Sequence, residues 1–468
     1  MLVSLRCLAR CVGITGRISL KDDLGSYFPS GASSRKSVRD LVGRLFDLCD
    51  EPWDCATPLF LGPYNSNPLA TEGADAGLLP ERGVDATVFS VLAALCKGIR
   101  SDTVVRAASM SWIYEDYAWA NPVGPVTSPT PAEFTDILID QVRAVGATDV
   151  SVILDKQWQD EIDKGEAAPT TRERLEEVAS AVHLDPVFDD VSVRMHNKFM
   201  LFSKLEFPAV AAGGGRRTAR RTAGVPDSWP RRMHWVVAQT SANFRASQHR
   251  RGNDLIVCYD NKPLYDAYLK AWDQIKDGVS TGGVTAESAL TVSAGPVKFY
   301  SFPRNRDLQE EYDPLSEALV AIGENASDSK APPRIRMISA HFTRGELLRK
   351  LQDLRESVPA IDMKILFSPS TDHVTPDGVD VVAALAESGI PVRLLPREMG
   401  QSNAGLPHQK VMFVDASLPD DDGRVARRRW VWTGSANHTV DSLKRADEIV
   451  IRIADAAVYQ GYARHFDL

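Results

Sequence analysis

Hydrophobic and polar positions alternate in blocks that predict an α/β protein from about residue 85 onwards. In the predicted helices, apolar residues recur along one stripe, as on the buried face of an amphipathic helix. In the predicted strands, short apolar runs are bounded by turn residues. The first half is predicted to have helices at 86–99, 134–145, 172–182 and 264–275, and strands at 103–112, 149–155, 191–202, 234–244 and 254–260.

The same order of elements then repeats. The second half is predicted to have strands at 334–342, 363–370, 390–396, 408–415, 427–438 and 447–455, and helices at 345–357 and 378–389. The period, roughly 200 residues, is far longer than that of a solenoid repeat. We therefore expect two duplicated α/β sandwich lobes, at 81–277 and 295–468, joined by a linker at 278–294 and preceded by an irregular segment at 1–80. A seam between such lobes is a preferred place for a site.

Each half carries the same pair of polar residues inside an apolar strand. These are His196 and Lys198 in the first half, and His408 and Lys410 in the second. Residues i and i+2 of a strand point to the same face. Each histidine is therefore expected to project together with its lysine.

A second pair of motifs follows each of these strands. Ser-x-Asn occurs once per half, and in each half an acidic residue follows the asparagine at the same distance, eleven positions. The residues are Ser241, Asn243 and Asp254 in the first half, and Ser435, Asn437 and Glu448 in the second. Surface or core strand residues would have to coincide in all three motifs to explain this pattern, so we interpret it as one functional constellation.

Composition and charge narrow the class of protein. Of the 468 residues, 44% are hydrophobic and 25% are charged, which is typical of a globular chain. The net charge of −8 argues against a surface that binds nucleic acid throughout, although it allows a local basic patch. Six cysteines without a CxxC pair predict neither a disulfide scaffold nor a cysteine zinc site. No metal site and no cofactor is expected.

The sequence has no apolar run long enough for a membrane-spanning helix. Arg6 and Arg10 interrupt the apolar N-terminal stretch, so it is not a clean signal peptide. A secreted and a cytoplasmic location both remain open, and we expect a monomer.

These motifs resemble those of the phospholipase D superfamily, in which an HxKxxxxD motif occurs twice per active site. His408, Lys410 and Asp415 match the motif fully, and Gly-Ser-Ala-Asn follows as in the family. The first copy departs from it, because Ser203 stands in the place of the aspartate. The resemblance covers about residues 85–465. It implies a phospholipase D-like fold with one active site at the lobe interface, and a structural role for Asp415.

Phosphodiester chemistry gives each residue a role. Two lysines, two asparagines and two serine hydroxyls could stabilise the negative charge that grows on the phosphate oxygens. One histidine would form a phosphohistidine and the other would act as general acid and base. Asp254 and Glu448 are the candidates for orienting the imidazoles. The resemblance assigns His196 as nucleophile and His408 as acid and base, and the reverse assignment stays open.

The leading hypothesis is a phospholipase D-type phosphodiesterase that acts on phospholipids at a membrane surface, by hydrolysis and by transfer to another alcohol. A nucleic-acid phosphodiesterase is the first alternative. The arginine-rich segment that begins at Arg216 and ends at Arg232 favours it, and the acidic balance disfavours it. A non-catalytic phosphate-binding protein is the second alternative, and the two intact His-Lys pairs argue against it.

Overall fold

The computed structural model describes residues 88–113, 131–163, 169–185, 195–207, 231–245, 248, 253–281, 284–328, 331–368, 373–394 and 407–466. The predicted irregular segment at 1–80 lies outside the described residues. So does most of the arginine-rich segment, of which only Arg231 and Arg232 are described, both exposed.

The first lobe is built on a six-stranded sheet with the order β3-β2-β1-β4-β5-β6. β1, β2 and β3 run parallel, and the pairs β1–β4, β4–β5 and β5–β6 are antiparallel. The strands are β1 Val105–Ser109, β2 Val150–Asp155, β3 Ala181–Asp185, β4 Lys198–Glu206, β5 Arg232–Thr240 and β6 Leu255–Cys258.

The second lobe repeats this order and adds two strands, giving β11-β10-β9-β12-β13-β14-β8-β7. The parallel part again comprises three strands, β9, β10 and β11, and β12 again pairs antiparallel beside it. The strands are β7 Thr291–Ala294, β8 Val297–Phe302, β9 Arg334–Ser339, β10 Asp362–Phe367, β11 Val392–Leu394, β12 Lys410–Pro419, β13 Val425–Gly434 and β14 Glu448–Ile453.

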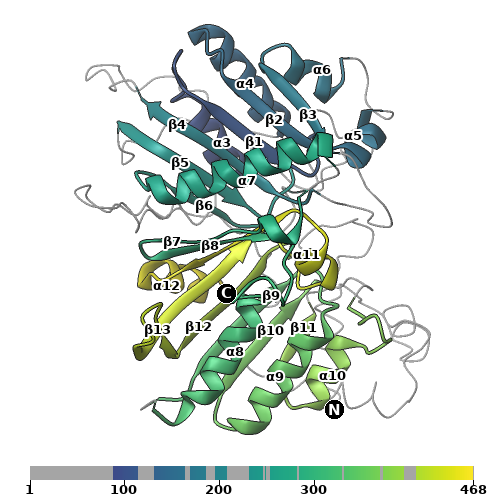
Figure 1. Cartoon of the computed structure of the whole chain (residues 1–468), viewed down its shortest axis with the longest axis vertical. Helices are drawn as coiled ribbons and strands as arrows, with labels where there is room; N and C mark the ends of the chain where they lie inside the picture. Colours follow the sequence, from purple (N-terminus) through teal and green to yellow (C-terminus); the bar gives the residue numbers. More distant parts are fainter. Residues whose placement is uncertain are drawn as a thin grey trace, which may run out of the picture.

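Helices cover the sheets, and the described residues form three apolar cores. One core joins α3 and α4 to the first sheet, and a second joins α8, α9 and α10 to the second sheet. The third core contains residues of both sheets together with α7 and α12, so it binds the two lobes to each other. Figure 1 shows the lobes stacked along the long axis, the first above the second. The helices are α3 Val88–Cys96, α4 Pro131–Val145, α5 Lys156–Asp163, α6 Thr171–Glu176, α7 Lys262–Thr281, α8 Pro314–Glu324, α9 Gly345–Ser357, α10 Val381–Glu387, α11 Val440–Lys444 and α12 Ala456–Phe466.

The alternation of residues along β4 and β12 explains how one strand serves two cores. Met200 and Phe202 of β4 pack in the outer core of the first lobe, whereas Phe199 and Leu201 pack in the core between the lobes. Successive strand residues point to opposite faces, so a strand covered on both sides reads as a continuous apolar run. This is why both strands could be recognised in the sequence.

The two-lobed α/β fold predicted from the sequence is confirmed, and some elements differ. The helix expected at 172–182 ends at Glu176, and the half-buried edge strand β3 follows it. The expected linker at 278–294 contains the end of α7 and the strand β7. Hydrogen-bond partners far along the chain stabilise these short elements, and local periodicity carries no signal of such partners.

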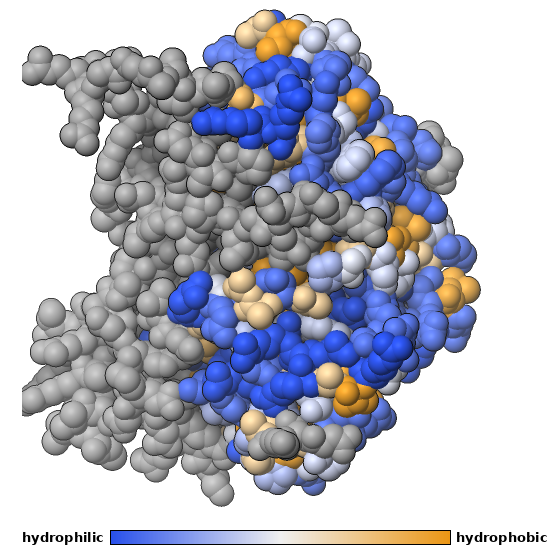
Figure 2. Space-filling view, turned by 90° about the vertical axis from the view of Figure 1, so that its left-hand side faces the viewer, coloured by the Kyte–Doolittle hydropathy of each residue, from blue (hydrophilic) through white to orange (hydrophobic). Residues whose placement is uncertain are grey.

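The described surface in Figure 2 is mostly hydrophilic, with small separate hydrophobic areas. Within the ranges given above, no helix combines the length and the apolar character needed to span a bilayer.

Candidate active site

The two His-Lys pairs occupy the same place in the two lobes. Lys198 is the first residue of β4 and Lys410 the first residue of β12, and each histidine lies two positions earlier. All four side chains are buried. Lys198 Nζ donates a hydrogen bond to the carbonyl oxygen of His196, and Lys410 Nζ donates to that of His408. Each lysine therefore contacts the main chain of its own histidine, and the projection of both side chains from one face stays a prediction.

Each histidine is held by the opposite lobe. Nδ1 of His196 lies 2.8 Å from Oε1 of Glu448, and the His196 amide donates to the carbonyl of Asp447 at 3.0 Å. In the other direction, Nδ1 of His408 lies 2.9 Å from the carbonyl oxygen of Ser241. These crossed contacts bring the two motifs together at one seam.

Burial and neighbouring charges set the protonation states at the seam. Burial lowers the pKa of His196 to about 4; Glu448 opposes this effect, and Lys198 and Lys410 add to it. Burial also lowers the pKa of Lys198 to about 7, against the attraction of Glu448 and Asp155. Burial alone would raise the pKa of Glu448, but His196 and Lys198 hold it below its ordinary value. His196 is therefore a neutral imidazole next to a carboxylate at pH 7.

The serine hydroxyls of the Ser-x-Asn motifs bond to the neighbouring strand. Ser241 Oγ accepts from the amide of Asp254, and Ser435 Oγ accepts from the amide of Ile449, both at 3.0 Å. Asn243 is buried and Asn437 half-buried. Their buried Oδ1 atoms have no hydrogen-bond partner among the described residues. The phosphate-binding role of both motifs stays a prediction.

The strand register shows that the two predicted acids, Asp254 and Glu448, do not occupy equivalent positions in the two lobes. Because Asp254 and Ile449 make the same contact with the equivalent serines, Asp254 is equivalent to Ile449. Asn253 therefore occupies the place of Glu448. Equal spacing in the sequence does not give equal places here, because the segment before β6 is one residue shorter than the segment before β14.

The side chain of Asp254 points away from the side that Asn253 faces, as neighbouring strand residues do. Its Oδ2 atom accepts hydrogen bonds from Thr433 and Tyr462 of the second lobe, both at 2.6 Å. Glu448 thus contacts a histidine directly, whereas Asp254 binds hydroxyl groups across the seam.

Asp415 and Ser203 hold equivalent places with different partners. Asp415 of β12 forms ion pairs with Arg427 and Arg429 of β13, so it links two strands. Ser203 of β4 accepts a hydrogen bond from the amide of Val104 at 2.9 Å. Each contact stays within the sheet of its own lobe. This supports the predicted structural role of Asp415.

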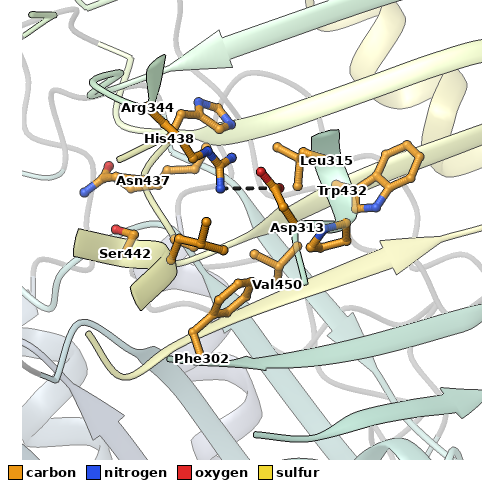
Figure 3. Close-up of a pocket in the computed structure, with 13 residues that line it drawn as sticks. Phe302, Asp313, Leu315, Arg344, Trp432, Asn437, His438, Ser442 and Val450 are labelled. Atoms are coloured by element: carbon orange, nitrogen blue, oxygen red, sulfur yellow. Dashed lines mark ion pairs between the residues drawn. The ribbon is translucent and has the colours of Figure 1, made fainter. Parts of the chain in front are cut away.

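A pocket of the second lobe borders this seam, beside Lys410 and Asn437 (Figure 3). Its walls include apolar side chains of β8, α8, α11 and β14. In Figure 3 the dashed line joins Arg344 to Asp313, a buried ion pair with Nη1 and Oδ1 3.3 Å apart, and His438 lies beside Arg344. The sequence pattern did not identify these three residues, because no motif marks them. Among the described residues, no group of three or more His, Cys, Asp or Glu could hold a metal ion.

The model of the family described as "Cardiolipin synthase, PLD-like domain" matches residues 329–468, most of the second lobe. A search of curated protein sequences finds no match. Among solved structures, the phosphatidylserine synthase of Haemophilus influenzae is 11% identical with a TM-score of 0.45, and the match covers 81% of this chain and 83% of that one.

The TM-scores of two further structures are no higher. The polyphosphate kinase of Porphyromonas gingivalis is 12% identical with a TM-score of 0.45; the match covers 81% of this chain but only 45% of the kinase. Nuc from Salmonella typhimurium, described as a phospholipase D family member, is 22% identical with a TM-score of 0.25, over 36% of this chain and 90% of Nuc.

The family match covers the lobe with the complete His-Lys-Asp motif, and the first lobe repeats its strand order and its His-Lys pair. PLD-like proteins are phosphodiesterases or transferases. The match to this PLD-like domain family covers 140 of the 468 residues, within the second lobe.

Proposed function

We propose that this chain is a phospholipase D-type enzyme that cleaves phospholipid phosphodiesters through a phosphohistidine on His196. The observation that carries the proposal is the 2.8 Å contact between Nδ1 of His196 and Oε1 of Glu448. A carboxylate at this nitrogen keeps the proton on Nδ1 and orients the ring. The lone pair of Nε2 is then available for attack.

In the first step, Nε2 of His196 attacks the phosphorus atom. The P–N bond forms while the bond from phosphorus to the oxygen of the leaving alcohol breaks. His408 gives its Nε2 proton to that oxygen, since an alkoxide is a poor leaving group. A pKa of about 4 keeps His196 unprotonated at neutral pH, as a nucleophile requires.

In the second step, water or a second alcohol attacks the phosphohistidine. His408 takes the proton of the attacking oxygen, the new P–O bond forms and the P–N bond breaks. Water yields a phosphomonoester, and an alcohol yields a new diester. Lys198, Lys410, Asn243 and Asn437 are proposed to stabilise the negative charge on the phosphate oxygens in both steps.

A phospholipid is the proposed substrate. The description of the matching family, which names cardiolipin synthase, supports it. The net charge of −8 also disfavours long-range attraction of a nucleic acid. We propose that the chain works as a monomer at the membrane surface, since both halves of the site lie in one chain.

A substrate panel tests this proposal. The purified chain is incubated with phosphatidylcholine, phosphatidylglycerol and cardiolipin in mixed micelles, with single-stranded DNA, and with a p-nitrophenyl phosphodiester. Each lipid reaction is run with and without an added alcohol. Release of a head group that depends on His196 is the expected result. Cleavage of DNA with no lipid cleavage would replace the phospholipid proposal by the nuclease alternative.

A trapping experiment tests the covalent step. A diester labelled with ³²P is mixed with the wild type and quenched in base, which preserves phosphohistidine. The labelled peptide is expected to contain residue 196. Label on residue 408 would reverse the assignment of the two histidines, and the absence of label at all quench times would contradict the covalent mechanism.

A further inference from the structure

Asp254, Thr433 and Tyr462 form a buried cluster across the seam that the proposed reaction does not use. Asp254 directly precedes β6 in the first lobe, and Thr433 of β13 and Tyr462 of α12 come from the second. Both hydroxyls donate to one carboxylate oxygen at 2.6 Å. All three residues are at most 2% exposed. Hydrogen bonds to a buried charge are among the stronger ones in proteins.

The main chain of Asp254 is hydrogen-bonded to Thr240 and Ser241, and Ser241 contacts His408. Its amide donates to Ser241 Oγ at 3.0 Å, and its carbonyl accepts from the Ser241 amide at 3.2 Å and from Thr240 Oγ1 at 2.6 Å. The carbonyl of Ser241 in turn lies 2.9 Å from Nδ1 of His408. Three consecutive contacts therefore connect Tyr462 to the imidazole of His408.

We propose that Tyr462 is a positioning residue for His408. Its hydroxyl holds Asp254, and Asp254 in turn fixes Ser241, so that the Ser241 carbonyl stays in place to contact Nδ1 of His408. Thr433 shares this role. The inference rests on the proposed function, because it assigns His408 the task of protonating the leaving alcohol. The other carboxylate oxygen of Asp254 is buried without a hydrogen-bond partner among the described residues. The carboxylate therefore depends on these two hydroxyls, and loss of one leaves a buried charge poorly satisfied.

The first lobe supplies a matched control. Tyr268 of α7 is as buried as Tyr462, and its hydroxyl donates to Oε1 of Gln239 on β5 at 3.1 Å. That contact stays within the first lobe and ends on a neutral amide. Removing the Tyr268 hydroxyl therefore costs a similar buried hydrogen bond without releasing Asp254.

The test compares Tyr462→Phe, Thr433→Val and Tyr268→Phe with the wild type on two diesters. One releases an aliphatic alcohol, which needs a proton, and the other releases p-nitrophenolate, which needs none. For Tyr462→Phe and Thr433→Val, kcat for the aliphatic substrate is expected to fall about tenfold with KM unchanged. The first burst of p-nitrophenolate should keep its rate within about twofold. Tyr268→Phe should behave as the wild type on both.

An equal loss on both substrates, no loss on either, or the same loss in Tyr268→Phe would overturn the inference. Histidine ring ¹⁵N NMR provides a readout without turnover, and it keeps the two proposals apart. The Nδ1 resonance of His408 is expected to move in Tyr462→Phe and in Thr433→Val but not in Tyr268→Phe. If the wild type cleaves no diester, the proposed function fails, while the NMR result still decides the positioning. An unmoved Nδ1 resonance in both seam variants overturns it.

Discussion

The two lobes share their strand order and their His-Lys pairs, but they provide different surroundings for the two histidines. Glu448 brings a carboxylate to His196, whereas Ser241 brings a main-chain carbonyl to His408. The equivalent of Glu448 in the first lobe is Asn253. A carboxylate stabilises a positive charge developing on its imidazole more than a neutral carbonyl does. A nearly symmetric fold can therefore give two identical side chains unequal chemistry.

The lobes differ also on the outer side of the seam. In the first lobe, Trp112 stacks on Phe134 and meets Phe244 edge to face, and all three rings are fully buried. The parallel bridges Trp112–Phe244 and Phe342–His438 make Phe244 and His438 equivalent. A polar imidazole therefore stands next to the pocket of the second lobe, where the first lobe has a packed aromatic ring. Trp112 is a core residue of the first lobe.

Removal of either histidine is expected to have the largest effect on activity. His196→Ala and His408→Ala are both expected to lower steady-state turnover by at least about a thousandfold, since each takes part in both steps. The two variants should differ in the burst with a p-nitrophenyl diester. His408→Ala should retain the burst and then stall, and His196→Ala should show none. Stopped-flow absorbance measures both, and equal bursts in the two variants would contradict unequal roles.

Glu448→Gln tests the carboxylate itself. We expect kcat to fall about tenfold to a hundredfold, because the ring keeps an acceptor but loses the charge. In the wild type, kcat/KM should fall below a pH of about 4, where His196 takes up a proton, and above about 7, where Lys198 loses one. Glu448 raises the pKa of both groups, so its loss should move both limbs to lower pH. If both limbs of the pH profile stay at the same pH in Glu448→Gln, Glu448 does not influence the pKa values of His196 and Lys198.

His438→Phe places the first-lobe residue in the second lobe. Burial, with Arg344, Lys410 and His373, lowers the pKa of His438 to about 3 from 6.5. The unfolded chain therefore binds a proton that the folded chain does not, and stability is lost as the pH falls from 6.5 towards 3. When the pH is lowered from 6.5 to 4.5, the free energy of unfolding of the variant should fall by roughly 2 kcal/mol less than that of the wild type. Urea unfolding at both pH values measures this, and equal losses would contradict a neutral His438.

The smallest effects are expected at the third residue of the motif, which is Asp415 in one lobe and Ser203 in the other. Asp415→Asn should lower the free energy of unfolding by about 1 kcal/mol, because it weakens two partly exposed ion pairs. Ser203→Ala should lower the free energy of unfolding by about 1 kcal/mol, because the amide of Val104 loses its hydrogen-bond acceptor. Turnover should stay within about tenfold of the wild type in both variants, measured beside thermal unfolding. A larger loss of kcat with unchanged stability would give this position a direct role in the chemistry.

Sequence reasoning found the strands and the His-Lys pairs because both depend on local periodicity. An apolar run covered on both faces and a polar pair at i and i+2 are visible without knowledge of the partner strand. Asp254 shows the limit of this reasoning. Its distance from the preceding asparagine equals that of Glu448, yet a segment shorter by one residue turns its side chain to the other face.

The contacts that cross the seam could not be predicted in this way. Glu448 lies more than two hundred positions from His196, and no spacing rule relates them. Tyr462, Arg344 and His438 belong to no motif, so their importance depends on packing partners that only the three-dimensional structure supplies. Register and lobe packing are long-range properties, whereas hydrophobic periodicity is a local one.

The exchange of orienting oxygens between lobes also has a consequence for how such a chain evolves. Had the two halves remained separate identical subunits, any substitution beside one histidine would have appeared beside the other as well. Two copies within one chain can differ from each other, so a glutamate stands in one lobe at the place where the other has an asparagine. A homodimer with one sequence for both subunits could not encode this division of labour between the two imidazoles.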